Sequence, residues 1–321
     1  MTRNLRSRRS EVVGLNRRAR LALSLFLAAG LVACGRSETP AGSAQTSSST
    51  SSASSRPLTI KGSDTMVILT QRLTEEYMKR NPADRVQVNG GGSGTGIAAL
   101  INGTVDLAQA SRPMKDEERA AAEKARGGKI VETPVALDSL AVFVNEGNPV
   151  KELTIPQLAA IFTGKTRNWK DVGGKDAPII LYGRENSSGT YEYFREHVLE
   201  KADFAATVQT LQGTAAIVNA VGRDANGIGY GGIAYSKGVR AIALRKDAAT
   251  PAVAPSEATV ADGTYPLSRK LFYYAFDNSP ERVTKYVRWT LTPDAQALVK
   301  QVGYFPLSDT AGGSTAGTTT K

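Results

Sequence analysis

The sequence is short of the residues that most hydrolases and metal proteins use. It has one cysteine, Cys34, and one histidine, His197, in 321 residues. A single thiol excludes an internal disulfide framework and a multi-cysteine metal site. The motifs H-E-x-x-H and G-x-S-x-G are also missing from the sequence. We therefore expect no catalytic residues, no metal and no cofactor.

The sequence also has little net positive charge outside its first segment. The formal net charge is +10, but residues 1–20 alone hold seven arginines against the single acid Glu11. No stretch after residue 57 combines a block of Lys and Arg with interleaved aromatics. Nucleic acid is therefore not an expected partner, whereas the mild positive balance that remains suits an anionic ligand.

No apolar run is long enough to span a bilayer. The longest candidate, residues 21–33, has 13 residues, and a spanning helix needs roughly 20. This run follows the basic segment, as in a bacterial export signal. Residues 31–35 resemble a lipobox, in which the thiol of Cys34 is lipidated and becomes the first mature residue. The alternatives left open are an incidental cysteine and export by the twin-arginine route, for which Arg8-Arg9 and Arg17-Arg18 are weak signals.

The composition divides the chain into four parts. We expect a signal peptide at 1–33, a Ser-rich flexible tether at 34–57 and a disordered polar tail at 309–321. Between them, alternating strand-like and helix-like segments predict an α/β protein of two lobes. The expected strands are 58–61, 86–89, 105–110, 130–135, 140–145, 179–182, 228–230, 239–244 and 271–276. The expected helices are 66–80, one ending near 101, 115–126, 155–163, 191–198, 213–221 and 280–300.

Four loops of this pattern have the composition of an anion site. They are 62–65, 92–95, 111–113 and 187–190, and each is expected to follow a strand and to lie where a helix begins. A helix N-terminus exposes free N–H groups and a partial positive charge, and hydroxyl side chains add donors. Arg112 and Arg184 lie in or just before two of these loops and could bind an oxyanion through two hydrogen bonds. The alternatives are ordinary helix caps and structural ion pairs, such as Arg184 with Glu185.

Four segments together, 62–66, 91–95, 106–112 and 184–190, resemble the periplasmic phosphate-binding proteins of phosphate ABC importers. The likeness extends over about 58–308 and includes 226–230 and 303–307. It implies a two-lobed periplasmic-binding-protein fold of type II, with two crossover strands and a ligand cleft between the lobes. Lobe 1 would comprise 58–137 and 270–308, and lobe 2 would comprise 138–269. The implied function is capture of inorganic phosphate and its delivery to the membrane subunits of an ABC importer, by a protein that is not an enzyme and that we expect to be monomeric.

The resemblance also implies the ligand residues. Matched motif by motif, the first two loops contribute Thr65, the backbone of Met66, and Ser93, and we add Ser63 and Asp64 of the first loop as further candidate ligand residues. The other two loops contribute Ser111, Arg184, Ser188, Gly189 and Thr190. In well-known members an aspartate that accepts the phosphate proton follows the serine of the third loop, whereas this sequence has Arg112 there.

The identity of the proton acceptor is therefore an open question. Phosphate near neutral pH carries a proton and sulfate carries none, so a buried carboxylate acceptor would favour phosphate. Asp64 and Asp138 are the candidates, and Arg112 would offset the added negative charge. Asp64 as a simple helix cap and Asp138 as a hinge residue are the alternatives.

The sequence allows a few other interpretations of its function. Residues 227–232 fit G-x-G-x-x-G formally, but they lack the expected strand and acidic residue of a dinucleotide site. The alternatives for function are binding of another oxyanion or an organophosphate and, less favoured because no activating base is evident, a phosphatase on the same fold.

Overall fold

The computed structural model describes residues 56–307, which form a mixed α/β protein built on one nine-stranded sheet. The strand order is β2-β1-β3-β11-β4-β8-β6-β7, and β9 pairs with β4 beside this path. No helix within the described range is long and apolar enough to cross a membrane. The predicted signal peptide, Cys34 and the predicted tail lie outside the described residues.

The first half of the sheet follows the βα alternation that the sequence predicts. β1 (Leu58–Gly62) pairs in parallel with β2 (Val86–Asn89) and with β3 (Leu107–Ala110). The helices α1 (Val67–Arg80), α2 (Ser93–Ile101) and α3 (Asp116–Arg126) connect these strands and lead on to the next one. Leu69, Leu73 and Tyr77 recur every four residues of α1 and are buried, which fixes the helix on the sheet.

Two long antiparallel strands join the halves of the sheet. They are β4 (Ile130–Val144) and β11 (Ser268–Phe276), and they pair along the whole of β11. The prediction of separate strands at 130–135 and 140–145 is wrong, because Asp138 stays in the ladder opposite Arg269 instead of breaking it. The polar residue that looked like an interruption therefore has a partner in the neighbouring strand.

The second half has a core of its own. Its strands are β6 (Ile180–Arg184), β7 (Gln209–Leu211), β8 (Gly227–Gly232) and β9 (Arg240–Ala241), with a separate pair β5 (Glu152–Thr154) and β10 (Ala243–Arg245). Its helices are α4 (Ile155–Phe162), α5 (Gly189–His197), α6 (Thr214–Arg223) and α7 (Glu257–Ala261). One strand was predicted at 239–244, but two short strands form, β9 on β4 and β10 on β5. Residues 227–232 form the fully buried β8 and not a phosphate-binding turn.

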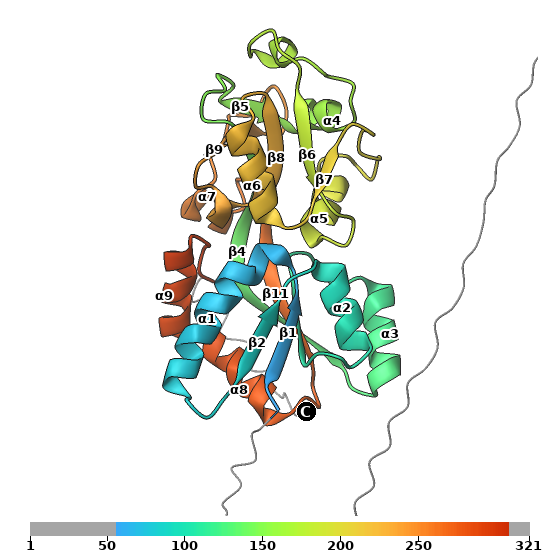
Figure 1. Ribbon diagram of the computed structural model, residues 1–321, viewed down its shortest axis with the longest axis vertical. Helices are drawn as coiled ribbons and strands as arrows, with labels where there is room; N and C mark the ends of the chain where they lie inside the picture. Colours follow the sequence, from blue (N-terminus) through green and yellow to red (C-terminus); the bar gives the residue numbers. More distant parts are fainter. Residues whose placement is uncertain (1–55, 308–321) are drawn as a thin grey trace, which may run out of the picture. The chain divides into compact units, whose positions relative to one another are not determined.

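The chain returns to the first half for its last two helices. α8 (Glu281–Thr290) and α9 (Pro293–Val302) pack against α1, and Figure 1 draws them in orange and red beside it. The single helix predicted at 280–300 is wrong. Thr292 caps α9 through its side chain and Pro293 occupies the first turn, so the chain starts a new helix there.

The apolar core is divided in the same way as the sheet. One cluster contains Leu73, Tyr77, Tyr273 and Tyr286 in the first half, and another contains Trp169 with the rings of Phe162, Phe194 and Tyr230 in the second. The strand β4 contributes residues to clusters of both halves, whereas β11 contributes residues only to clusters of the first half. The lobe limits expected from the sequence, at residues 137, 138, 269 and 270, stay a prediction.

Candidate functional site

Loops from both halves of the sheet meet at the carboxyl ends of its strands. β1 ends at Gly62, β3 at Ala110 and β6 at Arg184, and the residues that follow these strands contact one another. The loops contribute hydroxyl side chains that are almost wholly inaccessible to solvent, namely Ser63, Thr65, Ser93, Ser111, Ser188, Thr190 and Thr214. We call this set the hydroxyl cluster.

The hydroxyl cluster is held together across the two halves. Thr65 Oγ1 lies 2.7 Å from Thr190 Oγ1, and Ser63 Oγ donates to Ser111 Oγ over 2.9 Å. Ser111 Oγ is 3.4 Å from Thr190 Oγ1 and 3.5 Å from Ser93 Oγ. Hydroxyls that hydrogen-bond to one another can also donate to the oxygens of an anion. The arrangement therefore offers several donors converging from five loops.

Three members of this cluster lie at helix N-termini. Ser93 begins α2, Ser188 caps α5 and accepts hydrogen bonds from its first turn, and Thr214 begins α6. These positions combine a hydroxyl with the positive end of a helix dipole. The third loop differs from the prediction, because α3 begins only at Asp116 and Lys115 is its cap residue. The backbone N–H of Ser111 donates instead to Ser93 Oγ over 3.1 Å.

Gly189 allows the two halves to approach closely. A Cβ atom at this position would lie 2.3 Å from Ser93 Oγ and 2.9 Å from Ser111 Oγ. Real Cβ atoms essentially never come that close, so only glycine fits here while the hydroxyl cluster keeps its present form. Gly189, predicted as a ligand residue, thus also lies where the two halves of the sheet approach each other closely.

Arg184 is 2% exposed and touches both halves. Its Nη1 donates to Thr214 Oγ1 over 2.9 Å, and its Nη2 donates to Asp64 Oδ2 over 3.0 Å. Its Nε and Nη2 also donate to the carboxylate of Glu185 over 3.0 and 2.7 Å, which is the ion pair weighed as an alternative. The structure brings Arg184 to the hydroxyl cluster together with its neutralising acids.

Arg112 is placed differently from Arg184. Its Nη1 and Nη2 donate to Glu118 over 2.8 and 2.7 Å, and its Nε lies 2.7 Å from Glu192 Oε2 as an ion pair rather than a hydrogen bond. Glu118 belongs to the first half and Glu192 to α5 of the second. The predicted role of Arg112 as a ligand stays a prediction, while the contacts make it an ionic link between the halves.

The two candidate proton acceptors both contact an arginine. Asp64 Oδ1 accepts from the backbone of Gly91 over 3.0 Å and its other oxygen accepts from Arg184. Its side chain therefore joins two loops and does more than cap a helix. Asp138 is 0% exposed, and its Oδ2 accepts from Arg269 Nε over 2.9 Å. Burial raises the pKa of Asp138, and the charge of Arg269 opposes that rise.

The backbone N–H of Met66, which the sequence predicts as a ligand group, already has a hydrogen-bond acceptor within the protein. This N–H donates to the carbonyl oxygen of Ser63 over 3.1 Å, within the short 3-10 turn Asp64–Met66. An anion bound to this N–H would have to replace that hydrogen bond. The predicted contact with the backbone of Met66 stays a prediction.

Sequence reasoning missed Arg269 and Thr214. Arg269 is 6% exposed, and its Nη1 and Nη2 donate over 3.1 Å each to Ser111 O and Thr190 Oγ1. A signal for it was an arginine at the edge of an apolar, tyrosine-rich strand. Thr214 follows the strand β7, whose residues are largely exposed and which therefore gave no apolar pattern. Its Gly-Thr pair at the start of α6 has the same composition as the four loops that were found.

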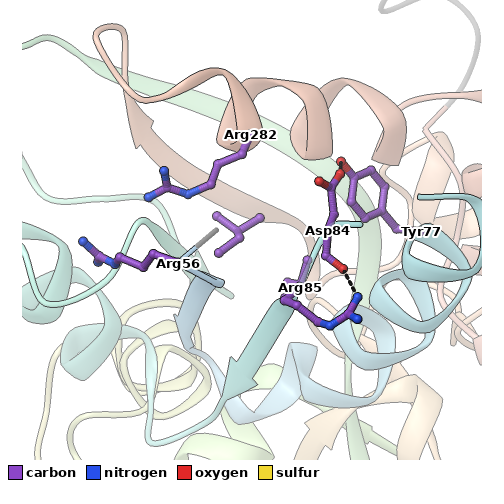
Figure 2. Close-up of a pocket in the computed structure, with 7 residues that line it drawn as sticks. Arg56, Tyr77, Asp84, Arg85 and Arg282 are labelled. Carbon is purple, nitrogen blue, oxygen red and sulfur yellow. Dashed lines mark hydrogen bonds between the residues drawn. The ribbon is translucent and has the colours of Figure 1, made fainter. Parts of the chain in front are cut away.

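A separate arginine-lined cavity lies away from the hydroxyl cluster. It measures about 120 Å³ and is lined by Arg56, Tyr77, Asp84, Arg85 and Arg282, together with Leu58 and Val86 at the amino ends of β1 and β2 (Figure 2). Two of its three arginines pair with the same carboxylate. Asp106 lies 2.8 Å from Arg282 and 3.6 Å from Arg56, and Tyr77 donates to Asp84 over 2.7 Å. These paired charges at the opposite end of the strands make it a weaker anion site than the hydroxyl cluster.

Comparison with known proteins gives consistent matches over most of the chain. The model of the PBP superfamily domain matches residues 40–304. Phosphate-binding protein PstS of Pseudomonas aeruginosa is 38% identical over 264 residues, covering 77% of this chain and 81% of that protein. Phosphate-binding protein PstS of Staphylococcus epidermidis is 34% identical over 253 residues, covering 76% of this chain and 77% of that protein.

Solved structures give the same result. A putative phosphate ABC transporter substrate-binding protein with bound phosphate from Clostridium perfringens superposes with a TM-score of 0.71 at 28% identity, covering 78% of this chain and all of that one (100%). An ABC-type phosphate transport receptor from Vibrio cholerae superposes with a TM-score of 0.64 at 30% identity, with coverage of 78% and 100%. The family match includes every residue of the hydroxyl cluster.

Proposed function

We propose, from the premise that this chain belongs to the PBP superfamily and to its family of phosphate-binding proteins, that it binds inorganic phosphate and passes it to an ABC importer. The observation that carries the proposal is the hydroxyl cluster, in which buried hydroxyl donors from five loops gather and which two buried arginines, Arg184 and Arg269, contact. The relatives named above are phosphate-binding proteins, and the Clostridium perfringens structure holds phosphate.

The ligand residues follow from this proposal. The phosphate oxygens would accept hydrogen bonds from Ser63, Thr65, Ser93, Ser111, Ser188 and Thr190, from backbone N–H groups at Met66 and Gly189, and from Arg184. The hydroxyls hydrogen-bond to one another in this structure. The oxygens of phosphate would replace neighbouring hydroxyl oxygens as the acceptors of these hydrogen bonds. Asp138 or Asp64 would accept the proton of phosphate, which sulfate lacks.

The two halves would act as lobes that close on the ligand. Loops of both halves contribute to the hydroxyl cluster, so a ligand bound there gains contacts with both only when the halves are together. The crossover strands β4 and β11 would be where the lobes hinge, with lobe limits as predicted from the sequence. The importer would recognise the closed form.

The proposal places the protein outside the cytoplasmic membrane. The chain would be exported, lipidated on Cys34 and tethered to the membrane by residues 34–57, as a monomer with no catalytic activity. The support is the lipobox-like sequence at 31–35 and the names of the relatives, which are binding proteins. Mass spectrometry of the membrane-extracted protein tests the anchor: a diacylglyceryl mass on the peptide that begins at Cys34 is expected, and an unmodified N-terminus would contradict it.

Calorimetric titration tests the ligand. The mature chain with Cys34→Ser, stripped of ligand, is titrated with phosphate, arsenate and sulfate near neutral pH. We expect phosphate to bind about 5- to 150-fold more tightly than sulfate, because a carboxylate facing an oxyanion without a proton costs about 1–3 kcal/mol. Strong binding of another oxyanion with no heat from phosphate would favour the alternative ligand class.

A further inference from the structure

Arg269 is the one side chain of the described residues that we find linking three parts of the site. It lies in β11, opposite Asp138 of β4, so the pair belongs to the two crossover strands. Its Nη1 donates to the carbonyl oxygen of Ser111 in the first half, and its Nη2 donates to Thr190 Oγ1 in the second, each over 3.1 Å. Its guanidinium also lies 5.4 Å from the centre of the Tyr193 ring in α5.

Arg269 supplies the positive charge that faces Asp138. Asp138 is 0% exposed, and Arg269 Nη2 lies 2.8 Å from its Oδ2. The other oxygen, Oδ1, accepts a hydrogen bond from the backbone of Ile233 over 3.2 Å. A carboxylate without solvent is stable only when a charge or several hydrogen bonds compensate it.

The remaining titratable groups close to Asp138 do not replace that charge. They are the tyrosines of α5, η3 (Ile233–Tyr235) and the segments beside β11 and after α9, namely Tyr193, Tyr235, Tyr265 and Tyr304. Burial raises the pKa of each, so each stays neutral near neutral pH. A second ion pair at the site, Arg184 with Asp64, makes its other side-chain hydrogen bonds to Gly91, Thr214 and Glu185.

We propose that Arg269 is a positioning and specificity-determining residue: it holds Asp138 as an ionised acceptor and orients Thr190, so that the site selects an oxyanion that carries a proton. The inference rests on the proposed function and extends it to a residue outside the predicted ligand set. Arg269 acts through Asp138 and Thr190 and needs no contact with the ligand itself.

The proposal makes selectivity, and not only affinity, depend on Arg269. Without it, Asp138 is buried with only a backbone N–H as partner, and burial raises its pKa further. A protonated Asp138 donates a hydrogen bond where it had accepted one. The altered site then loses the acceptor for the proton of phosphate and accepts the fully deprotonated sulfate as well.

The sign of the pH effect follows from the same change. A carboxyl group with a raised pKa is ionised only at higher pH. In the Arg269→Met variant, discrimination between phosphate and sulfate should therefore be poor near neutral pH and return as pH rises. In the unaltered protein, Arg269 opposes that rise in the pKa of Asp138, so discrimination should change less over the same range.

The experiment compares phosphate and sulfate binding by calorimetry in the unaltered chain and in Arg269→Met, Arg269→Lys and Asp138→Asn. For Arg269→Met and Asp138→Asn we expect phosphate to bind at least about 30-fold more weakly, from a loss of about 2 kcal/mol or more, and sulfate to bind as well as before or better. Arg269→Lys keeps the charge and should restore part of the selectivity. Arg282→Met is the matched control, because Arg282 pairs with Asp106 outside the site.

An equal loss for both anions in Arg269→Met, with no dependence on pH, would overturn the proposal and leave Arg269 a merely structural residue. Circular dichroism first establishes that each variant is folded. If Arg269→Met does not fold, Asp138→Asn and Arg269→Lys decide, since an unchanged ratio of the two affinities in both contradicts the proposal. Absence of phosphate binding by the unaltered chain would instead refute the proposed function.

Discussion

Arg184 joins loops of both halves at the site. It donates to Thr214 and Asp64, which belong to different halves of the sheet, and it pairs with its neighbour Glu185. Replacing Arg184 with methionine removes its positive charge. The carboxylate of Asp64 then has no arginine partner and lies next to the bound phosphate. We expect Arg184→Met to weaken phosphate binding by about 2–5 kcal/mol, measured by calorimetry.

The control for this change is Arg195→Met. Arg195 also lies in α5 of the second half, but it pairs at the surface with Asp203, 3.2 Å away. This variant should keep the affinity of the unaltered chain, because an exposed pair contributes little. Equal affinities of Arg184→Met and Arg195→Met would show that Arg184 is not part of the anion site.

Gly189→Ala tests the closeness of the two halves. The added methyl group would lie 2.3 Å from Ser93 Oγ, so α5 or α2 must shift to make room. Overpacking of this kind costs about 1–3 kcal/mol, which corresponds to a roughly 5- to 150-fold loss of phosphate affinity. The measurement is again calorimetry, with the melting temperature recorded to separate a local effect from unfolding.

Gly147→Ala is the matched control for Gly189→Ala. Gly147 lies in the loop after β4, and a Cβ atom there would come no closer than 3.4 Å to Asn145 Oδ1. The Gly147→Ala variant should bind phosphate with the affinity of the unaltered chain. If Gly189→Ala also binds normally, the approach of Gly189 to Ser93 and Ser111 is not needed for binding.

The sequence predicted some of these residues and could not predict others. Ser63, Thr65, Ser93, Ser111, Ser188 and Thr190 could be found because small hydroxyl residues and glycine recur at the ends of predicted strands. Arg269 could not be found in this way, because its role depends on a neighbour that is distant in sequence. Asp138 and Arg269 are 131 residues apart and meet only when β4 pairs with β11.

At the scale of elements, the break between α8 and α9 depends on Thr292. Its hydroxyl accepts a hydrogen bond from the N–H of Ala295 at the start of α9. Loss of such a cap costs about 1 kcal/mol, so Thr292→Ala should lower the melting temperature by about 2–4 °C. Phosphate affinity should not change, because α9 lies outside the hydroxyl cluster.

The control for the cap is Thr284→Ala within α8. The Thr284 hydroxyl only donates back to Glu281 O in its own helix, so its removal should cost less than about 0.5 kcal/mol. Differential scanning fluorimetry of both variants suffices. Equal shifts in the two melting temperatures would contradict a special role for Thr292.

Element prediction failed where a local pattern had two interpretations. Residues 280–300 have continuous helical periodicity, and only the Thr-Pro pair at 292–293 indicates the stop. Residues 130–144 contain Asp138 and Ser139, which favour a break in any local prediction. Both are buried in one strand, because β11 pairs with them and β8 continues the pairing from Leu140 onward.

At the scale of the whole described structure, ion pairs join the two halves. Arg112 and Lys115 precede α3 in the first half, and both contact Glu192 of α5 in the second. Closure would bring these opposite charges together, so their attraction would contribute to binding. Glu192→Gln should weaken phosphate binding about two- to fivefold, from a loss of about 0.5–1 kcal/mol.

Ionic strength provides the check on this prediction. Salt screens pairs that are partly open to solvent, and the Glu192 side chain is 28% exposed. The difference in affinity between Glu192→Gln and the unaltered chain should therefore shrink as salt is added. A difference that is the same at low and high salt would show that Glu192 acts by packing and not by charge.

The two-lobed α/β class followed from the sequence because strand and helix patterns alternate through it. The crossover geometry came from the family resemblance, since no local pattern tells which distant strands pair. The sheet order, with β11 inserted between β3 and β4, shows why: the last strand within residues 56–307 pairs in the first half of the sheet.

The most direct test of the central claim is a crystal structure of the mature chain grown with phosphate. Our account predicts a tetrahedral anion bound among Thr65, Ser93, Ser111 and Thr190, within hydrogen-bond distance of Arg184. Phosphate bound instead in the arginine-lined cavity of Figure 2, with the hydroxyl cluster unchanged, would contradict it.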